Sequence, residues 1–168
     1  MERIYLTNSN PTPVTTGWNI SLPANLFENT LEEVVESIRT GIILSRNIVP
    51  QILAIRDPNL AHDYRRNLKT GLPYFVGTIF SGRRDSASVD YATCLIVDID
   101  HVGDGKIEEL KHRLITDIPF IRHVFRSPSD GVKAIIRFDT PIADSLTFGL
   151  VFQYVSGFLK ARGIQIDQ

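Results

Sequence analysis

Cysteine is almost absent from the sequence. Cys94 is the single cysteine among 168 residues, so a disulfide within the chain is excluded. This composition fits a reducing compartment, and we expect a cytoplasmic protein. Cys94 lies inside an apolar run with no histidine or cation beside it, which predicts a core residue rather than a nucleophile.

Long hydrophobic runs and an excess of charge of one sign are absent as well. No apolar run approaches the roughly 20 residues of a membrane span, and the Met-Glu-Arg start lacks the apolar core of a signal peptide. We therefore expect no membrane partner. Lys and Arg number 18 against 19 Asp and Glu, so any contact with a polyanion must come from a local basic patch.

Hydrophobic periodicity and turn residues predict a mixed α+β protein. We expect helices at 30–41, after Asn47, at 57–69, 106–116 and 145–162, and strands at 72–80, 91–100, 120–126, 132–138 and 164–167. Thr30 and Glu33 form a capping box at the start of the first helix. The apolar face of the last helix is expected to run through Leu150, Val151, Tyr154, Val155, Phe158 and Leu159.

The chain divides into three predicted parts of one domain. Residues 1–30 are punctuated by proline and glycine and are expected to be irregular, with little function. Residues 31–90 form a helical and short-strand layer. Residues 91–168 follow the order βαββαβ, which predicts a ferredoxin-like or RRM-like antiparallel sheet with the first and third strands in the middle.

The carboxylates of Asp98 and Asp100 end the apolar strand 91–100. Alternate residues of a strand point to one face, so these side chains lie side by side, roughly 5–7 Å apart. Two like charges at this spacing favour a bound cation, and Mg²⁺ or Mn²⁺ prefers carboxylate oxygens. The alternative is that both residues only end the strand and begin a turn, as His101 also suggests.

The loop from Ser127 to Gly131 and the following Lys133 have the chemistry of a phosphate site. Ser127 and Ser129 offer hydroxyls, Gly131 allows an unusual backbone turn, and Lys133 supplies a cation. An ordinary turn between two strands, with Lys133 facing solvent, is the alternative.

The βαββαβ topology predicts that Asp98, Asp100, Lys133 and Asp167 converge at one end of the sheet. Asp167 would then be a third metal ligand, unless it is an exposed residue near the end of the sequence. Carboxylates that hold two metals beside a phosphate site suit nucleotidyl transfer to a 3′-hydroxyl.

The order and spacing of these motifs resemble the primase-polymerase-type domain of Bacteroidetes and their mobile elements. That domain is often labelled VirE N-terminal-like and belongs to the archaeo-eukaryotic primase superfamily. The resemblance covers about residues 30 to 168. It rests on Leu72-Pro73, the strand 95–100, the segment 127–137 and Ile166-Asp167.

The resemblance implies a catalytic acid pair at Asp98 and Asp100, and a third acid at Asp167. It implies nucleotide contacts from Ser127, Ser129, Gly131 and Lys133, whereas the Ser-x-His motif of the superfamily is missing. Asp130 replaces a usual glycine and adds a negative charge near the expected phosphates. Nucleoside triphosphates, a DNA or RNA template and a helicase-type domain in the full-length protein are the implied partners, and catalytic domains of the superfamily usually continue beyond the third acid.

Two other functions are compatible with the sequence. The first is a non-catalytic nucleic-acid-binding module with an RRM-like sheet, whose phosphate contacts would be Arg65, Arg66, Lys69, Arg83 and Arg84. The second is a nucleotide-sugar transferase, in which an Asp-x-Asp motif also binds metal and diphosphate. It predicts a large parallel sheet, for which this chain has too few βαβ units.

Overall fold

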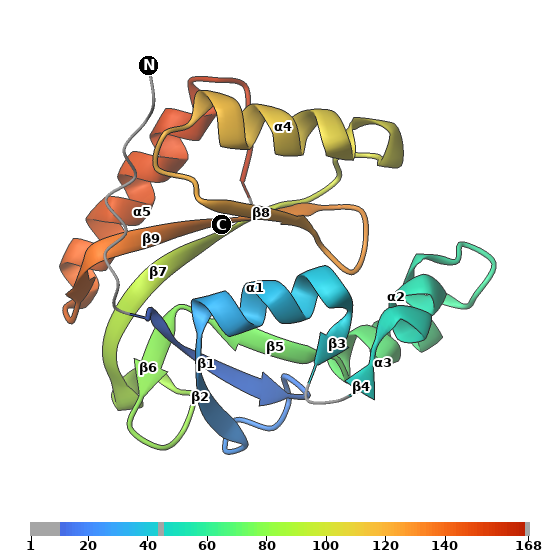
Figure 1. The fold of residues 1–168 in the computed structure, drawn as a ribbon, viewed down its shortest axis with the longest axis horizontal. Helices are drawn as coiled ribbons and strands as arrows, with labels where there is room; N and C mark the ends of the chain where they lie inside the picture. The colour runs from blue at the N-terminus through green and yellow to red at the C-terminus, as the bar shows by residue number, and fades with distance from the viewer. Residues whose placement is uncertain (1–10, 44–45, 167–168) are drawn as a thin grey trace.

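The computed structural model describes residues 11–43 and 46–166, which form a mixed α+β fold (Figure 1). Its first half contains β1 (Pro13–Trp18), β2 (Leu26–Thr30), α1 (Leu31–Thr40), β3 (Ile42–Ile43), β4 (Arg46–Asn47), α2 (Val49–Arg56), α3 (His62–Thr70), β5 (Pro73–Val76) and β6 (Thr78–Phe80). Its second half contains the 3₁₀ turn η1 (Ser86–Ser88), β7 (Val89–Ile99), the turn η2 (Asp104–Lys106), α4 (Ile107–Asp117), β8 (His123–Arg126), β9 (Val132–Ile142) and α5 (Ser145–Lys160).

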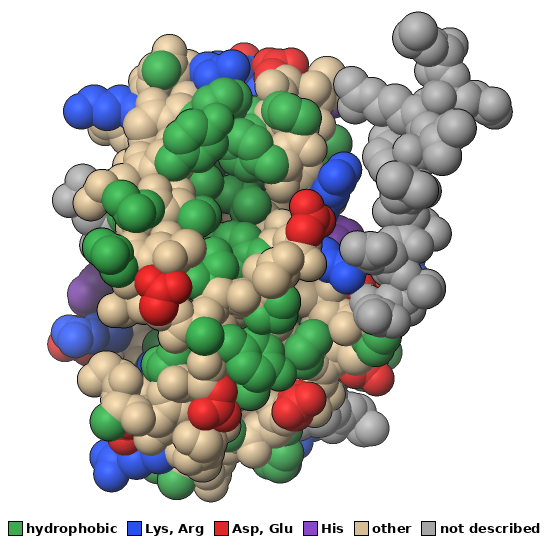
Figure 2. All heavy atoms as spheres, turned by 90° about the vertical axis from the view of Figure 1, so that its left-hand side faces the viewer, with side chains coloured by type: hydrophobic (Ala, Val, Ile, Leu, Met, Phe, Trp, Pro, Cys, Tyr) green, Lys and Arg blue, Asp and Glu red, His purple; other side chains and the backbone are tan. Residues whose placement is uncertain are grey.

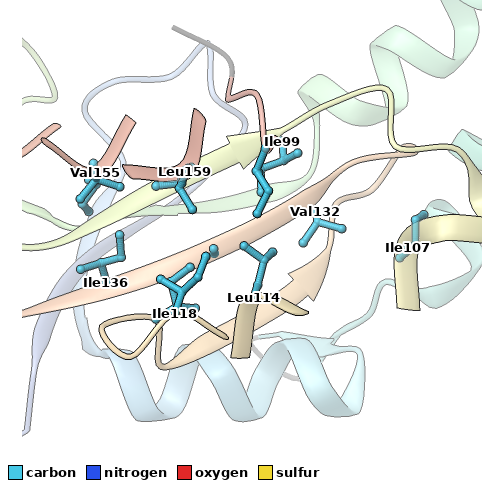
Figure 3. Close-up of a cluster of buried hydrophobic side chains, with 13 residues drawn as sticks. Ile99, Ile107, Leu114, Ile118, Val132, Ile136, Val155 and Leu159 are labelled. Atoms are coloured by element: carbon cyan, nitrogen blue, oxygen red, sulfur yellow. The ribbon is translucent and has the colours of Figure 1, made fainter. Parts of the chain in front are cut away.

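The larger sheet has the strand order β6-β7-β9-β8, and every pair in it is antiparallel. Helices α4 and α5 cover one of its faces (Figure 1). Between them lies the main core, in which side chains such as Leu114, Ile118, Val132 and Leu159 are almost completely buried (Figure 3). Because the core covers this face of β7 and β9, only the opposite face of these strands is available to line a functional site.

The predicted βαββαβ order is found in part. Elements β7, α4, β8, β9 and α5 follow one another as expected, and β7 and β9 are the central neighbours. The expected last strand is not formed at 164–166, and Asp167 lies outside the described residues. Strand β6 pairs with the first part of β7 on the edge where that strand was expected. The α+β class is therefore confirmed, and the ferredoxin-like topology is not.

The smaller sheet, β2-β1-β5, revises the interpretation of the N-terminal segment. Residues 13–30 were expected to be irregular, but they form an antiparallel hairpin, and β1 pairs with β5 on its other side. Val14 of β1 is fully buried with Leu31 and Val34 of α1, Cys94 of β7 and Ile135 of β9. Helix α1 thus lies between the two sheets (Figure 1).

Gly77 splits the predicted strand 72–80 into β5 and β6 and carries the chain from one sheet to the other. A Cβ at this position would overlap the carbonyl oxygen and the sulfur of Cys94. The carbonyl oxygen of Gly77 accepts hydrogen bonds from the backbone N–H of Thr93, at 2.7 Å, and from its hydroxyl, at 3.2 Å. The two sheets are therefore joined at a point that only glycine can occupy.

The helices α1 and α3 show where local sequence decides the fold. Thr30 and Glu33 form the predicted capping box, and Gly41 ends α1 with a positive φ of 69°. Helix α3 begins at His62, later than expected, because Asp57 forms a separate turn before it. In this turn, Asp57 Oδ1 accepts a hydrogen bond from the N–H of Asn59 at 2.9 Å.

Helix α5 buries less of its surface than its sequence suggests. Val155 and Leu159 pack into the main core, but Leu150 and Tyr154, which were expected on the same face, are exposed together with Leu146. Figure 2 shows hydrophobic side chains gathered on the side of the molecule that carries α5. No helix in the described part of the chain is long and apolar enough to cross a membrane.

Candidate active site

Strand β7 separates the core from the candidate site by simple alternation. Leu95, Val97 and Ile99 belong to the main core beneath α4 and α5. Asp98 lies between these positions and therefore points to the opposite face, which looks toward α1 and the smaller sheet. Of the carboxylate pair that the sequence singled out, Asp98 thus lies on the concave side between the two layers of the fold, and Asp100 follows the end of the strand.

Asp98 and Lys133 meet across the β7–β9 pair, as the topology predicted. The two residues are register partners, and Lys133 Nζ donates a hydrogen bond to Asp98 Oδ2. Their side chains are 36% and 28% exposed, respectively. The second carboxylate oxygen, Oδ1, is buried and has no hydrogen-bond partner among the described residues. Leaving such an acceptor unpaired costs about 1–3 kcal/mol, so this atom is suited to a ligand that the protein alone does not supply.

Asp100 packs against the tip of the β8–β9 hairpin. A Cβ built on Gly131 would come within 2.6 Å of Asp100 Oδ1 and 2.7 Å of the carbonyl oxygen of Ile99. Gly131 is therefore needed for the close approach of the hairpin tip to the end of β7. From the sequence, Gly131 was expected to allow an unusual backbone turn. In the structure, glycine is needed instead because a Cβ at this position would collide with its neighbours.

Ser127 closes the hairpin tip from inside. It is only 2% exposed, and its Oγ accepts a hydrogen bond from the N–H of Gly131 at 3.0 Å. The N–H of Ser127 donates in turn to the carbonyl oxygen of Gly131 at 2.9 Å. The two residues hold the loop in a fixed shape. Asp130, at the same tip, is exposed and does not line the cavity described below, so its charge faces outward.

Two cations from the N-terminal layer hold the same tip from outside. Arg56, in the last turn of α2, donates hydrogen bonds to the carbonyl oxygens of Ser127 at 2.8 Å and Pro128 at 3.2 Å. Lys69, in the last turn of α3, donates to Ser129 Oγ at 3.1 Å. Sequence reasoning missed Arg56, because no local pattern marks a contact between residues 71 positions apart.

A cavity of about 1180 Å³ opens between the layers, and Asp98 and Lys133 line it. Arginine and lysine predominate among its charged lining residues, whereas Glu33 and Asp98 are the acidic ones in the described part of the chain. Of the phosphate contacts predicted for a binding module, Arg66, Lys69 and Arg84 line this cavity. Arg65 and Arg83 do not. The cavity is therefore suited to an anionic ligand.

Aromatic side chains form part of the same cavity and were not expected from the sequence. The rings of Phe75 and Phe125 lie 6.1 Å apart, and the guanidinium of Arg84 lies 5.0 Å from the ring centre of Tyr74. Phe125 is the register partner of Lys133, so an apolar surface adjoins the charged pair. A flat base could lie against such rings while its phosphates meet the cations.

Burial shifts the pKa values of two titratable groups near this face. Burial raises the pKa of the Cys94 thiol to about 11, which agrees with the predicted core residue. Burial also lowers the pKa of His123, an effect that Glu32 opposes and Arg122 reinforces. Both groups are therefore uncharged near neutral pH.

The predicted metal ligands are placed in part. Asp98 lines the cavity, whereas Asp100 follows the end of β7 and does not line it. The unpartnered Oδ1 of Asp98 is a hard oxygen of the kind that Mg²⁺ and Mn²⁺ prefer. Within residues 11–43 and 46–166, no group of three or more His, Cys, Asp or Glu side chains is arranged to hold a metal ion. The third predicted ligand, Asp167, lies outside the described residues.

Neither a curated protein nor a solved structure matches the chain. A family described as "BT4734-like, N-terminal domain" matches residues 67–157, which is more than half of the chain and includes Asp98, Asp100, the hairpin tip and Lys133. The match agrees with the Bacteroidetes-type part of the resemblance noted in the sequence, whereas the family's name carries no activity. The chain belongs to the BT4734-like N-terminal domain family.

Proposed function

We propose that this chain is a primase- or polymerase-like nucleotidyltransferase domain, which joins nucleotides to the 3′-hydroxyl of a nucleic acid with the help of Mg²⁺ or Mn²⁺. The observation that carries the proposal is the pairing of Asp98 with Lys133 on the wall of a cavity rich in cations. The buried, unpartnered Oδ1 of Asp98 supports a bound cation at this position.

The proposed chemistry assigns separate tasks to the two strands. At the end of β7, Asp98 and Asp100 would hold the divalent ion, with Asp167 as a third ligand. The bound ion would supply charge neutralisation and activation of the attacking hydroxyl. On β9, Lys133 would neutralise phosphate charge as it develops during transfer, because its ammonium group is held at the same strand end.

The hairpin tip would position the nucleotide. Ser127 and Gly131 lock the loop, and Asp100 packs against it, so phosphate-binding groups and metal-binding groups are held in one rigid unit. Ser129 has a hydroxyl that could contact a phosphate beside Lys69. A rigid arrangement of this kind favours catalysis, since no reorganisation is needed when the substrate binds.

The test is synthesis on a primed template or of a dinucleotide, with Mn²⁺ or Mg²⁺ and nucleoside triphosphates. We expect Asp98→Asn to reduce synthesis by at least about a hundredfold, because the metal-binding oxygens lose their charge. Asp90→Asn is the matched control. Asp90 is exposed at the start of the same strand and does not line the cavity, so its loss should leave synthesis unchanged. Undiminished synthesis by Asp98→Asn would exclude the proposal.

A second candidate function is nucleic-acid binding without catalysis. The cations Arg66, Lys69 and Arg84 on the cavity wall favour it. It predicts binding that weakens steeply with salt and does not depend on a divalent ion. The nucleotide-sugar transferase alternative has little support, because all strand pairs in the described part of the chain are antiparallel.

A further inference from the structure

Lys69 and Arg66 lie on one side of α3 and face the cavity. They are three residues apart, the spacing that places two side chains on the same helix face, and both line the cavity. Arg65 precedes Arg66 on the same helix but does not line the cavity. Helix α3 is held in place by α2, since Gln51 Nε2 donates a hydrogen bond to the carbonyl oxygen of Leu68 at 2.7 Å.

The positive charge of Lys69 is uncompensated, in contrast to that of Lys133. Lys133 is paired with the carboxylate of Asp98, whereas Lys69 donates to the neutral hydroxyl of Ser129. Among the described residues, neither Lys69 nor Arg66 has a carboxylate within ion-pair distance. Excess positive charge therefore lies on the α3 side of the hairpin tip, Asp98 and Asp100 lie on the β7 side, and the exposed Asp130 lies at the tip itself.

Because of this separation of charge, the cavity is more positive near α3 than near the end of β7. The hairpin tip holds Lys69 through Ser129 Oγ, whereas Asp98 of β7 holds Lys133. The two ammonium groups are therefore held by different parts of the cavity wall. A chain of two or more linked phosphates could reach from the metal-binding carboxylates to α3.

We propose that Lys69 and Arg66 of α3 form a subsite for the outermost phosphates of a polyphosphate ligand, so that this site selects nucleoside triphosphates over monophosphates. The inference rests on the proposed function and deepens it. The inner phosphate lies beside Asp98, Asp100 and Lys133, and the distal phosphates point toward α3. Lys69 and Arg66 are then specificity-determining residues supplied by the N-terminal layer.

The experiment measures binding of ATP, AMP and inorganic tripolyphosphate in the presence of Mn²⁺ by titration calorimetry. We expect Lys69→Gln to weaken ATP and tripolyphosphate by about tenfold and AMP by less than twofold, because a charge-assisted hydrogen bond is lost only for the longer ligands. Lys69→Arg should restore most of the affinity for ATP. Lys160→Gln is the matched control, since Lys160 is an exposed cation in the last turn of α5, outside the cavity.

Three outcomes would overturn the inference while leaving the proposed function in place. The first is equal affinity of wild type and Lys69→Gln for ATP. The second is a uniform loss for ATP and AMP. The third is a loss confined to a single-stranded oligonucleotide titrated in the same way, which would make α3 a contact for the nucleic-acid strand. If the wild-type protein bound no ATP with Mn²⁺, the inference and the proposed function would fail together.

Discussion

Gly131→Ala tests whether the hairpin tip is packed against the end of β7. The new Cβ would lie 2.7 Å from the carbonyl oxygen of Ile99 and 2.6 Å from Asp100 Oδ1. The carbonyl cannot move freely, because Ile99 is paired in the sheet with Val132. Overpacking of this kind costs about 1–3 kcal/mol. For a chain of this size, each kcal/mol lowers the melting temperature by roughly 2–4 °C.

Gly149→Ala provides a control of opposite sign. Gly149 lies within α5, where an added Cβ meets nothing within 4 Å. Alanine should stabilise the helix by up to about 1 kcal/mol there, since glycine is the poorer helix former. Thermal unfolding followed by circular dichroism would compare both variants with the wild type. If Gly131→Ala were as stable as the wild type, the close packing of the tip on Asp100 and Ile99 would be refuted.

Two further predictions concern titratable groups whose pKa values are shifted by burial. With the pKa of its thiol raised to about 11, Cys94 should be ~0.1% thiolate at pH 8, so iodoacetamide should label it slowly in the native protein and rapidly in urea; fast native labelling, read by mass spectrometry, would contradict its burial. Burial lowers the pKa of His123, so the unfolded chain binds this proton first as the pH falls below about 6.5. The stability contributed by neutral His123 is therefore present above about pH 6.5 and is lost as the pH falls through its folded pKa. His123→Asn should flatten this part of the profile of unfolding free energy against pH, as measured by urea denaturation at a series of pH values.

The sequence predicted the central part of the candidate site because that part depends on strand alternation and on strand order. Asp98 and Asp100 follow an apolar strand, and β9 lies beside β7, so Asp98 and Lys133 become neighbours. Both relations follow from the period of two and from the order of elements. The capping box at Thr30 was likewise readable, since it is a local pattern.

What the sequence could not predict depends on contacts between distant segments. Nothing near Arg56 indicates that it binds the tip at Ser127 and Pro128. The break at Gly77 depends on the backbone of β7, and the hairpin β1–β2 is stabilised by burial of Val14 beneath α1. Leu150 and Tyr154 match a helical core pattern, yet the other elements leave them uncovered. In each case tertiary packing overrides the local pattern.

A fragment that folds with an intact candidate site must include the N-terminal layer. The segment that matches the family begins at residue 67, after α1 and α2, and ends before Leu159. A fragment trimmed to those limits would expose Cys94 and Ile135 to water on one side of β7 and β9, and would lose Leu159 from the other. It would also release the hairpin tip from Arg56. Boundaries for expression and for transplanting the domain should therefore follow the two layers of the fold rather than the matched segment.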